Sequence, residues 1–172
     1  MQKKSRHESP SDNMSGDLIY RDGEDGSLEF VGNFEELYRV DANPWGQSGA
    51  DSVFKDYYEY SRSNLVECIS RLPRRDRVLE AGCGLGYVTD MLARESGAAC
   101  VEGADISAEA ISKARKLFPD VRFHVADMQA RDCTLKGHYD VVIYDQLIWY
   151  VLENFEQAIE NALSLLDDGD FF

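Results

Sequence analysis

One stretch of this sequence decides the fold: VLEAGCGLGYV, residues 78–88. Its apolar start indicates a buried strand over residues 77–80, and Tyr87 opens a helical pattern. Gly82, Gly84 and Gly86 therefore stand in the turn from a strand into a helix, the context in which a glycine motif is informative. Glycines let the backbone turn tightly and let a ligand lie against it without a Cβ in the way. The stretch predicts a ligand-binding loop.

Spacing and charge restrict the ligand of this loop. The spacing is Gly-x-Gly-x-Gly, not the Gly-x-Gly-x-x-Gly of dinucleotide-binding folds. Glu80 adds a negative charge beside the loop, which would repel a pyrophosphate and attract an ammonium group. Both features favour a ligand that carries an amino acid, and both argue against a nicotinamide-dependent oxidoreductase.

The residues around the loop alternate between helix and strand patterns. Pro73 ends the first helix, and Ser107 is a natural N-cap for the third. The pattern predicts helices over residues 53–72, 87–95, 108–118 and 154–166, and strands over residues 77–80, 98–104, 121–126 and 139–144. This alternation is typical of an α/β fold, a Rossmann-like doubly wound and mainly parallel sheet. The sequence ends as a fifth strand begins, so we expect a sheet cut at strand five.

Two further acids stand at predicted strand ends. Asp105 ends the second strand, nineteen residues after Gly86, and can accept hydrogen bonds from both hydroxyls of a ribose. Asp127 ends the third strand, where it can accept from the exocyclic amine of a purine. Together with Glu80 they line the crevice in which open parallel sheets bind ligands. Either aspartate alone could be a turn residue.

These residues resemble those of the class I S-adenosylmethionine-dependent methyltransferases, whose glycine loop reads E/D-x-G-x-G-x-G, over about residues 38–172. The resemblance implies that Glu80 and the loop hold the methionine portion, Asp105 the ribose, and Asp127 with Met128 the adenine. It implies no metal, and we nominate no catalytic base. The implied S-adenosylmethionine-binding set is Glu80, Gly82, Cys83, Gly84, Gly86, Asp105, Ile106, Asp127, Met128, Tyr144 and Trp45.

Two other segments resemble small-molecule methyltransferases, including nodulation-type sugar N-methyltransferases. One is a Tyr-x-x-x-Asp-Pro-Trp-like element that runs from Tyr38 to Trp45, and the other is LIWYV at residues 147–151. In those enzymes the N-terminal segment forms a lid over the cofactor, so Tyr38 and Trp45 would contact the cofactor or the acceptor. Trp45 could equally pack the N-terminal helix on the sheet. The resemblance implies methyl transfer to N or O of a sugar or natural product.

Composition excludes several partners. The net charge of −14 argues against nucleic acid and anionic membrane, and no apolar run approaches the 18 residues that a span needs. Asn43-Pro44-Trp45 lacks the second proline of the amino-methylating motif of nucleic-acid enzymes. The four cysteines form no CxxC pair, so we expect a cytoplasmic protein without a zinc cluster or disulfides.

The chain divides at residue 33. Residues 1–33 are expected to be a flexible acidic tail with a turn between residues 18–20 and 28–31, and residues 34–172 the methyltransferase domain, with 34–72 as its lid and helix. Strands five onward would complete the acceptor pocket, so the chain is either a fragment or a reduced domain that pairs with a partner, for example as a homodimer. The alternative function is a non-catalytic or truncated S-adenosylmethionine-binding domain.

Overall fold

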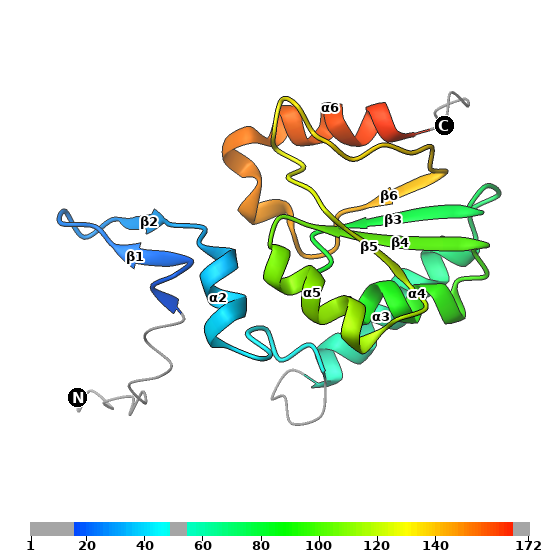
Figure 1. The fold of residues 1–172 in the computed structure, drawn as a ribbon, viewed down its shortest axis with the longest axis horizontal. Coiled ribbons are helices and arrows are strands. Elements are labelled where there is room, and N and C mark those ends of the chain that lie inside the picture. The colour runs from blue at the N-terminus through cyan, green and yellow to red at the C-terminus, as the bar shows by residue number, and fades with distance from the viewer. Residues whose placement is uncertain (1–15, 49–54, 167–172) are drawn as a thin grey trace, which may run out of the picture.

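The computed structural model of the chain describes residues 16–48 and 55–166, and its centre is a four-stranded parallel sheet (Figure 1). The strands are β3 (Arg77–Ala81), β4 (Cys100–Asp105), β5 (Arg122–Val125) and β6 (Val141–Ile143), and their order is β5-β4-β3-β6. β3 pairs with β4 on one side and with β6 on the other. The strand order therefore reverses beside β3, the strand that leads into the glycine loop. Such a reversal opens a crevice at the carboxyl ends of the strands.

Helices cover both faces of this sheet. α3 (Lys55–Ser70), α4 (Tyr87–Glu95) and α5 (Ala108–Leu117) lie on one face, and α6 (Phe155–Leu165) lies on the other (Figure 1). Val78 and Val101 pack toward α3 and α4, whereas Leu79 and Ala104 pack toward α6 with Leu165. Adjacent residues of β3 thus face opposite apolar layers, which explains why that strand has an unbroken apolar pattern. The predicted doubly wound parallel sheet is confirmed.

Three strands are shorter than the sequence predicts: β4, β5, which lacks one residue at each end, and β6. β4 starts at Cys100 and not at residue 98, because Gly97 is in a left-handed conformation and the Ala98 amide bonds to the Ser96 hydroxyl. β6 starts at Val141 because Tyr139 bridges Leu166, with the Tyr139 amide donating to the Leu165 carbonyl. That bridge brings the chain after α6 to the β6 side of the sheet, where strand five is expected. Residues 53, 54 and 167–172 of the predicted elements lie outside the described residues.

Gly86 forms the junction between the glycine loop and α4. Its φ is +81°, and an added Cβ would lie 2.6 Å from the Phe123 ring. We expect Gly86→Ala to lower the free energy of unfolding by at least about 2 kcal/mol, since left-handed strain and the overlap with a buried ring add. The measurement is urea denaturation. Gly97→Ala is the matched control, because Gly97 has φ +76° but its nearest neighbour would be 3.8 Å away. Equal losses in the two variants would refute the packing role of Gly86.

The segment before the sheet carries a hairpin and a short helix. β1 (Tyr20–Asp22) pairs antiparallel with β2 (Leu28–Phe30), so the predicted turn between these segments is present. The helix α2 (Phe34–Val40) follows, with the Asn33 side chain capping its first turn. The division of the chain at residue 33 stays a prediction.

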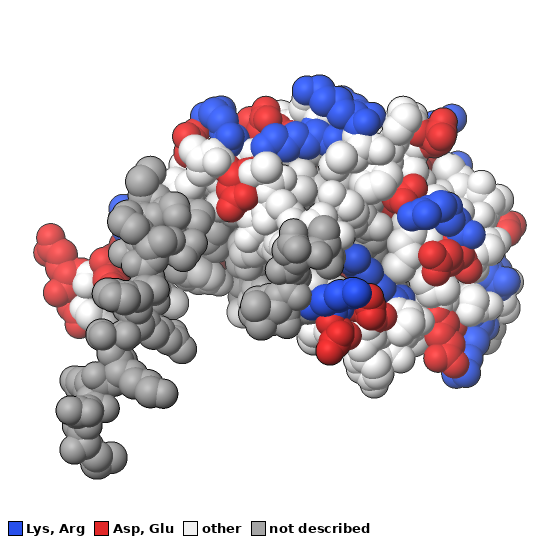
Figure 2. All heavy atoms as spheres, turned by 90° about the horizontal axis from the view of Figure 1, so that it is seen from below, with Lys and Arg blue, Asp and Glu red and all other residues white. Residues whose placement is uncertain are grey.

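On the face shown in Figure 2, several Lys and Arg side chains gather along the upper edge, and Asp and Glu side chains lie among and below them. Among the described residues, no helix has the length and apolar character to cross a bilayer.

Candidate functional site

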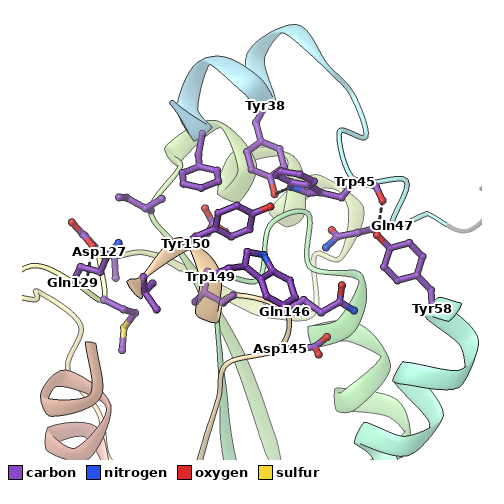
Figure 3. A pocket seen from close by; sticks show the side chains of 18 residues that line it. Tyr38, Trp45, Gln47, Tyr58, Asp127, Gln129, Asp145, Gln146, Trp149 and Tyr150 are labelled. Carbon is purple, nitrogen blue, oxygen red and sulfur yellow. Dashed lines mark hydrogen bonds between the residues drawn. The ribbon is translucent and has the colours of Figure 1, made fainter. Parts of the chain in front are cut away.

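A pocket opens where the carboxyl ends of the parallel strands meet the N-terminal segment (Figure 3). α2 and the loop after it form the roof, and the segment after β6 forms the wall opposite. Six of the residues predicted from the sequence line the pocket: Trp45, Gly82, Asp105, Ile106, Asp127 and Met128.

Asp105 is the most constrained polar group of the pocket. One carboxylate oxygen accepts from the Gly84 amide at 2.8 Å, and the other accepts from the Ser107 amide at 2.9 Å. A carboxylate has about four lone-pair sites, so two are left for a ligand with two adjacent hydroxyls. Burial raises the pKa of Asp105, while the two backbone amides oppose that shift. The Glu35 carboxylate accepts from the Ser107 hydroxyl at 2.7 Å and ties α2 to this network.

Glu80 lies behind the glycine loop and does not line the pocket. Its side chain is buried, and one carboxylate oxygen accepts from the Thr89 hydroxyl at 2.5 Å. Burial raises the pKa of Glu80 to about 8, and the nearby carboxylates of Asp145 and Asp105 add to the shift. Glu80 therefore cannot touch a ligand in the pocket directly. It can act on one only electrostatically, through the negative charge that it carries when ionised.

Four more predicted residues lie outside the lining of the pocket. Cys83 packs with Ile111 and Phe123, and Gly86 caps α4. An added Cβ on Gly84 would lie 2.5 Å from the Tyr38 hydroxyl, so Tyr38 covers this part of the loop. The Tyr144 hydroxyl donates to the Ala158 carbonyl at 2.8 Å, which directs its ring toward α6. Their assignment to the cofactor stays a prediction.

The roof of the pocket is a hydrogen-bonded aromatic assembly. The Trp45 indole N–H donates to the Tyr38 hydroxyl at 3.0 Å, and the Tyr58 hydroxyl donates to the Trp45 carbonyl at 2.6 Å. Tyr150 stands opposite, with its ring centroid 5.8 Å from that of Trp45 and 5.3 Å from that of Phe34. Trp45 thus both packs the N-terminal segment and faces the pocket. Lys113 adds a tie between α5 and the C-terminal end of α2, because its ammonium donates to the carbonyls of Tyr38 and Asp41.

Sequence reasoning missed part of the lining. It gave no role in the pocket to Phe34, Gln47, Tyr58 or Gln129. The signal that could have found Tyr58 is its hydroxyl group. A tyrosine buried against the sheet would need a hydrogen-bond partner for that group, so a tyrosine at this position indicates a polar contact. His124, which the alternation suggests is structural, bonds to the buried Glu102 carboxylate at 2.7 Å and does not line the pocket.

The fold and the pocket define an α/β protein with a small-molecule site at the switch point of its sheet. The family model described as "Methyltransferase domain" matches residues 78–169, more than half of the chain. The chain therefore belongs to this methyltransferase family, as the resemblance of its glycine loop predicts.

Individual relatives agree with this assignment. The chain is 32% identical over 96 residues to a malonyl-acyl-carrier-protein O-methyltransferase of Bacillus cereus. The aligned part is 54% of this chain and 35% of that one. The structure of N-methyltransferase NodS of Bradyrhizobium japonicum, solved with S-adenosylhomocysteine, matches this chain with a TM-score of 0.62 at 18% identity. The match covers 79% of this chain and 67% of that one. The amino pentose methyltransferase CalS10 of Micromonospora echinaspora, solved with S-adenosylmethionine, has a TM-score of 0.54 at 23% identity, covering 83% and 55%. These two structures share the fold.

The chain spans less than half the length of the curated relatives it matches. S-adenosylmethionine is the cofactor that membership of the methyltransferase family supports. The residues fit that group, because Asp105 keeps two lone pairs for a ribose and Gly82 brings the backbone of the glycine loop into the lining of the same pocket.

Proposed function

We propose that the chain transfers a methyl group from S-adenosylmethionine to a nitrogen or oxygen of a small-molecule acceptor, such as a sugar or natural product. The observation that carries the proposal is the placement of Asp105. Its carboxylate is held by two backbone amides, one of them from the glycine loop, at the edge of a pocket that Gly82 also lines. This combination supports a ligand with a ribose beside an amino-acid group.

Each side of the pocket has a proposed role. Asp105 would bind the ribose hydroxyls with Ile106 beside it, and Asp127 and Met128 would bind the adenine. Gly82 would present the loop backbone to the methionine portion. Leu147 packs against the side of Gly82 on which a Cβ would stand, 2.7 Å from that position, and would border the methionine portion.

The protein contributes positioning and exclusion of water. The bound cofactor supplies a sulfonium methyl group that is already reactive toward a lone pair. The roof of Tyr38 and Trp45 and the opposing Tyr150 would shield the reacting atoms. Two ties hold that roof in place: Glu35 of α2 accepts from the Ser107 hydroxyl, and Lys113 of α5 donates to the Tyr38 carbonyl. A neutral amine could be methylated without a base, whereas a hydroxyl needs its proton removed.

The test is calorimetric titration of the chain with S-adenosylmethionine and S-adenosylhomocysteine, with NAD as the control. We expect micromolar binding of the first two and none of NAD. Binding of NAD, or of none of the three by the folded chain, would contradict the proposal. Formation of S-adenosylhomocysteine with a panel of acceptors then separates an enzyme from a cofactor-binding domain without activity.

Gly82→Ala tests the assignment of the loop to the methionine portion. The variant should bind S-adenosylhomocysteine at least about tenfold more weakly, because the new methyl group displaces Leu147 into the pocket; tenfold corresponds to about 1.4 kcal/mol. Calorimetry measures the affinity, and circular dichroism checks that the variant is folded. Gly97→Ala, whose glycine is also left-handed but lies outside the pocket, should bind normally. Unchanged affinity of Gly82→Ala would show that the ligand does not lie on this loop.

A further inference from the structure

Part of the pocket remains after the predicted cofactor residues are assigned. It is formed by side chains from three separate segments: Gln47 from the loop after α2, Tyr58 from α3, and Asp145 and Trp149 from the segment after β6 (Figure 3). Gln146 has a left-handed φ of +54°, which turns the chain sharply between Asp145 and the residues that follow. These side chains lie at the end of the pocket away from Asp127 (Figure 3).

The charges of the pocket have one sign. Its lining carries three carboxylates, those of Asp105, Asp127 and Asp145, and no Lys, Arg or His from residues 16–48 and 55–166. Arg62 lies outside the lining, where its guanidinium donates to the Gln47 carbonyl at 2.6 Å and lies 5.2 Å from the Tyr58 ring centroid. Its charge lowers the pKa of Asp145, but burial outweighs that effect. Asp105 accepts from two backbone amides and Asp127 accepts from the Gln129 amide, which leaves Asp145 as the carboxylate at this end for a cationic ligand. An anionic acceptor would be repelled here.

Aromatic rings complete the same end. Tyr58, Trp149 and Tyr150 all line it, and the Trp149 and Tyr150 rings meet edge to face with centroids 6.2 Å apart. The Trp149 side chain is also half-exposed, so one ring borders solvent at the mouth. The faces of such rings attract cations, most strongly where a site is partly desolvated.

We propose that this end of the pocket, between Asp145 and the rings of Tyr58, Trp149 and Tyr150, binds the methyl acceptor as an amine that is protonated in water. This inference rests on the proposed function and narrows its acceptor to amines. An ammonium satisfies both the carboxylate and the rings. A hydroxyl can donate to the carboxylate but is not drawn to the ring faces, and a carboxylate acceptor satisfies neither.

The chemistry balances with Asp145 as the proton acceptor. The ammonium passes one proton to the Asp145 carboxylate, which frees the nitrogen lone pair. That lone pair forms the new N–C bond as the C–S bond breaks, and the electron pair of the C–S bond stays on sulfur. The products are a methylated ammonium and a neutral thioether, and Asp145 returns its proton to solvent. Burial raises the pKa of Asp145, which is the direction that a group taking a proton from an ammonium requires.

The experiment uses the full chain saturated with S-adenosylhomocysteine and three probes of one shape. Choline carries a trimethylammonium group, dimethylbutanol replaces it by an uncharged tert-butyl group, and dimethylbutanoate carries a carboxylate. Choline cannot be methylated, so calorimetry reports binding alone. We expect choline to bind at least about tenfold more tightly than dimethylbutanol, and dimethylbutanoate to bind least.

Variants locate the effect. Asp145→Asn should remove most of the preference for choline over dimethylbutanol. Asp132→Asn, an equal change of charge at an exposed residue outside the pocket, should preserve it.

Equal binding of choline and dimethylbutanol, or tighter binding of dimethylbutanoate, would overturn the inference. So would choline that binds the empty protein and is displaced by S-adenosylhomocysteine, because the rings and carboxylate would then serve the cofactor. Failure of S-adenosylhomocysteine itself to bind counts against the proposed function and is seen in the preceding titration.

Discussion

Asp105→Ala should weaken binding of S-adenosylhomocysteine by about tenfold to a hundredfold and also lower the stability of the empty protein. Loss of a charged hydrogen-bond partner costs about 1–3 kcal/mol, and the ligand loses a partner for both ribose hydroxyls. The Gly84 and Ser107 amides lose their acceptor as well, and leaving a buried donor unsatisfied costs about 1–3 kcal/mol. Calorimetry measures the first effect and urea denaturation the second.

Asp105→Asn separates these two effects. Its side chain keeps the shape but has one acceptor oxygen in place of two, so it can serve only one of the two backbone amides well. We expect a loss of stability smaller than that of Asp105→Ala and a loss of affinity nearly as large. Normal affinity in both variants would remove the ribose assignment, whatever their stability.

The parts of the site that sequence reasoning found are those that a local pattern defines. Gly82 is recognised by a turn between a strand and a helix, and Asp105 by its place at the end of the next strand, because the carboxyl ends of parallel strands meet at one edge. The doubly wound sheet follows from the same alternation. Asp127 is at the expected strand end for the same reason.

The parts that were missed depend on contacts between distant segments. Tyr58 and Gln47 reach the pocket because α3 and the loop after α2 pack over the sheet, and no local pattern shows that a helix tyrosine bonds to the carbonyl of Trp45. Tyr144 shows a second difficulty. Side chains alternate along β6, so Tyr144 faces α6 while the next residue, Asp145, lines the pocket. A one-residue uncertainty in a strand end exchanges the two faces.

Glu80→Gln should produce the largest pH-dependent change. The folded protein holds the Glu80 proton with a pKa of about 8, against an ordinary value of 4.5, mainly because the carboxyl is buried. A carboxyl whose pKa is raised by folding stabilises the folded state fully below its unfolded pKa, and that contribution is lost as the pH rises through the folded pKa. The wild type should thus lose on the order of 1.4 kcal/mol for each pH unit between about 4.5 and 8 from this group.

The variant has no such loss, since its amide does not ionise. Relative to the wild type, Glu80→Gln should become more stable as the pH rises from 5 to 8, a comparison made by urea denaturation at several pH values. Asp132→Asn, which also removes one carboxylate but at an exposed residue outside the pocket, is the control and should show no such pH-dependent gain. A stability difference between wild type and Glu80→Gln that does not change with pH would show that Glu80 is ionised in the empty protein.

Binding of the cofactor product should reverse this protonation. The ammonium of S-adenosylhomocysteine near the glycine loop favours the Glu80 carboxylate, so the wild type should release a proton on binding at pH 7, and its affinity should rise between pH 6 and 8. Calorimetry in two buffers with different ionisation enthalpies counts that proton. Glu80→Gln should release fewer protons and bind at least about tenfold more weakly at pH 8, because a neutral amide attracts an ammonium less than a carboxylate does. Equal proton release in the two proteins would mean that the ammonium lies elsewhere, and Glu80 would then be a structural partner of Thr89 alone.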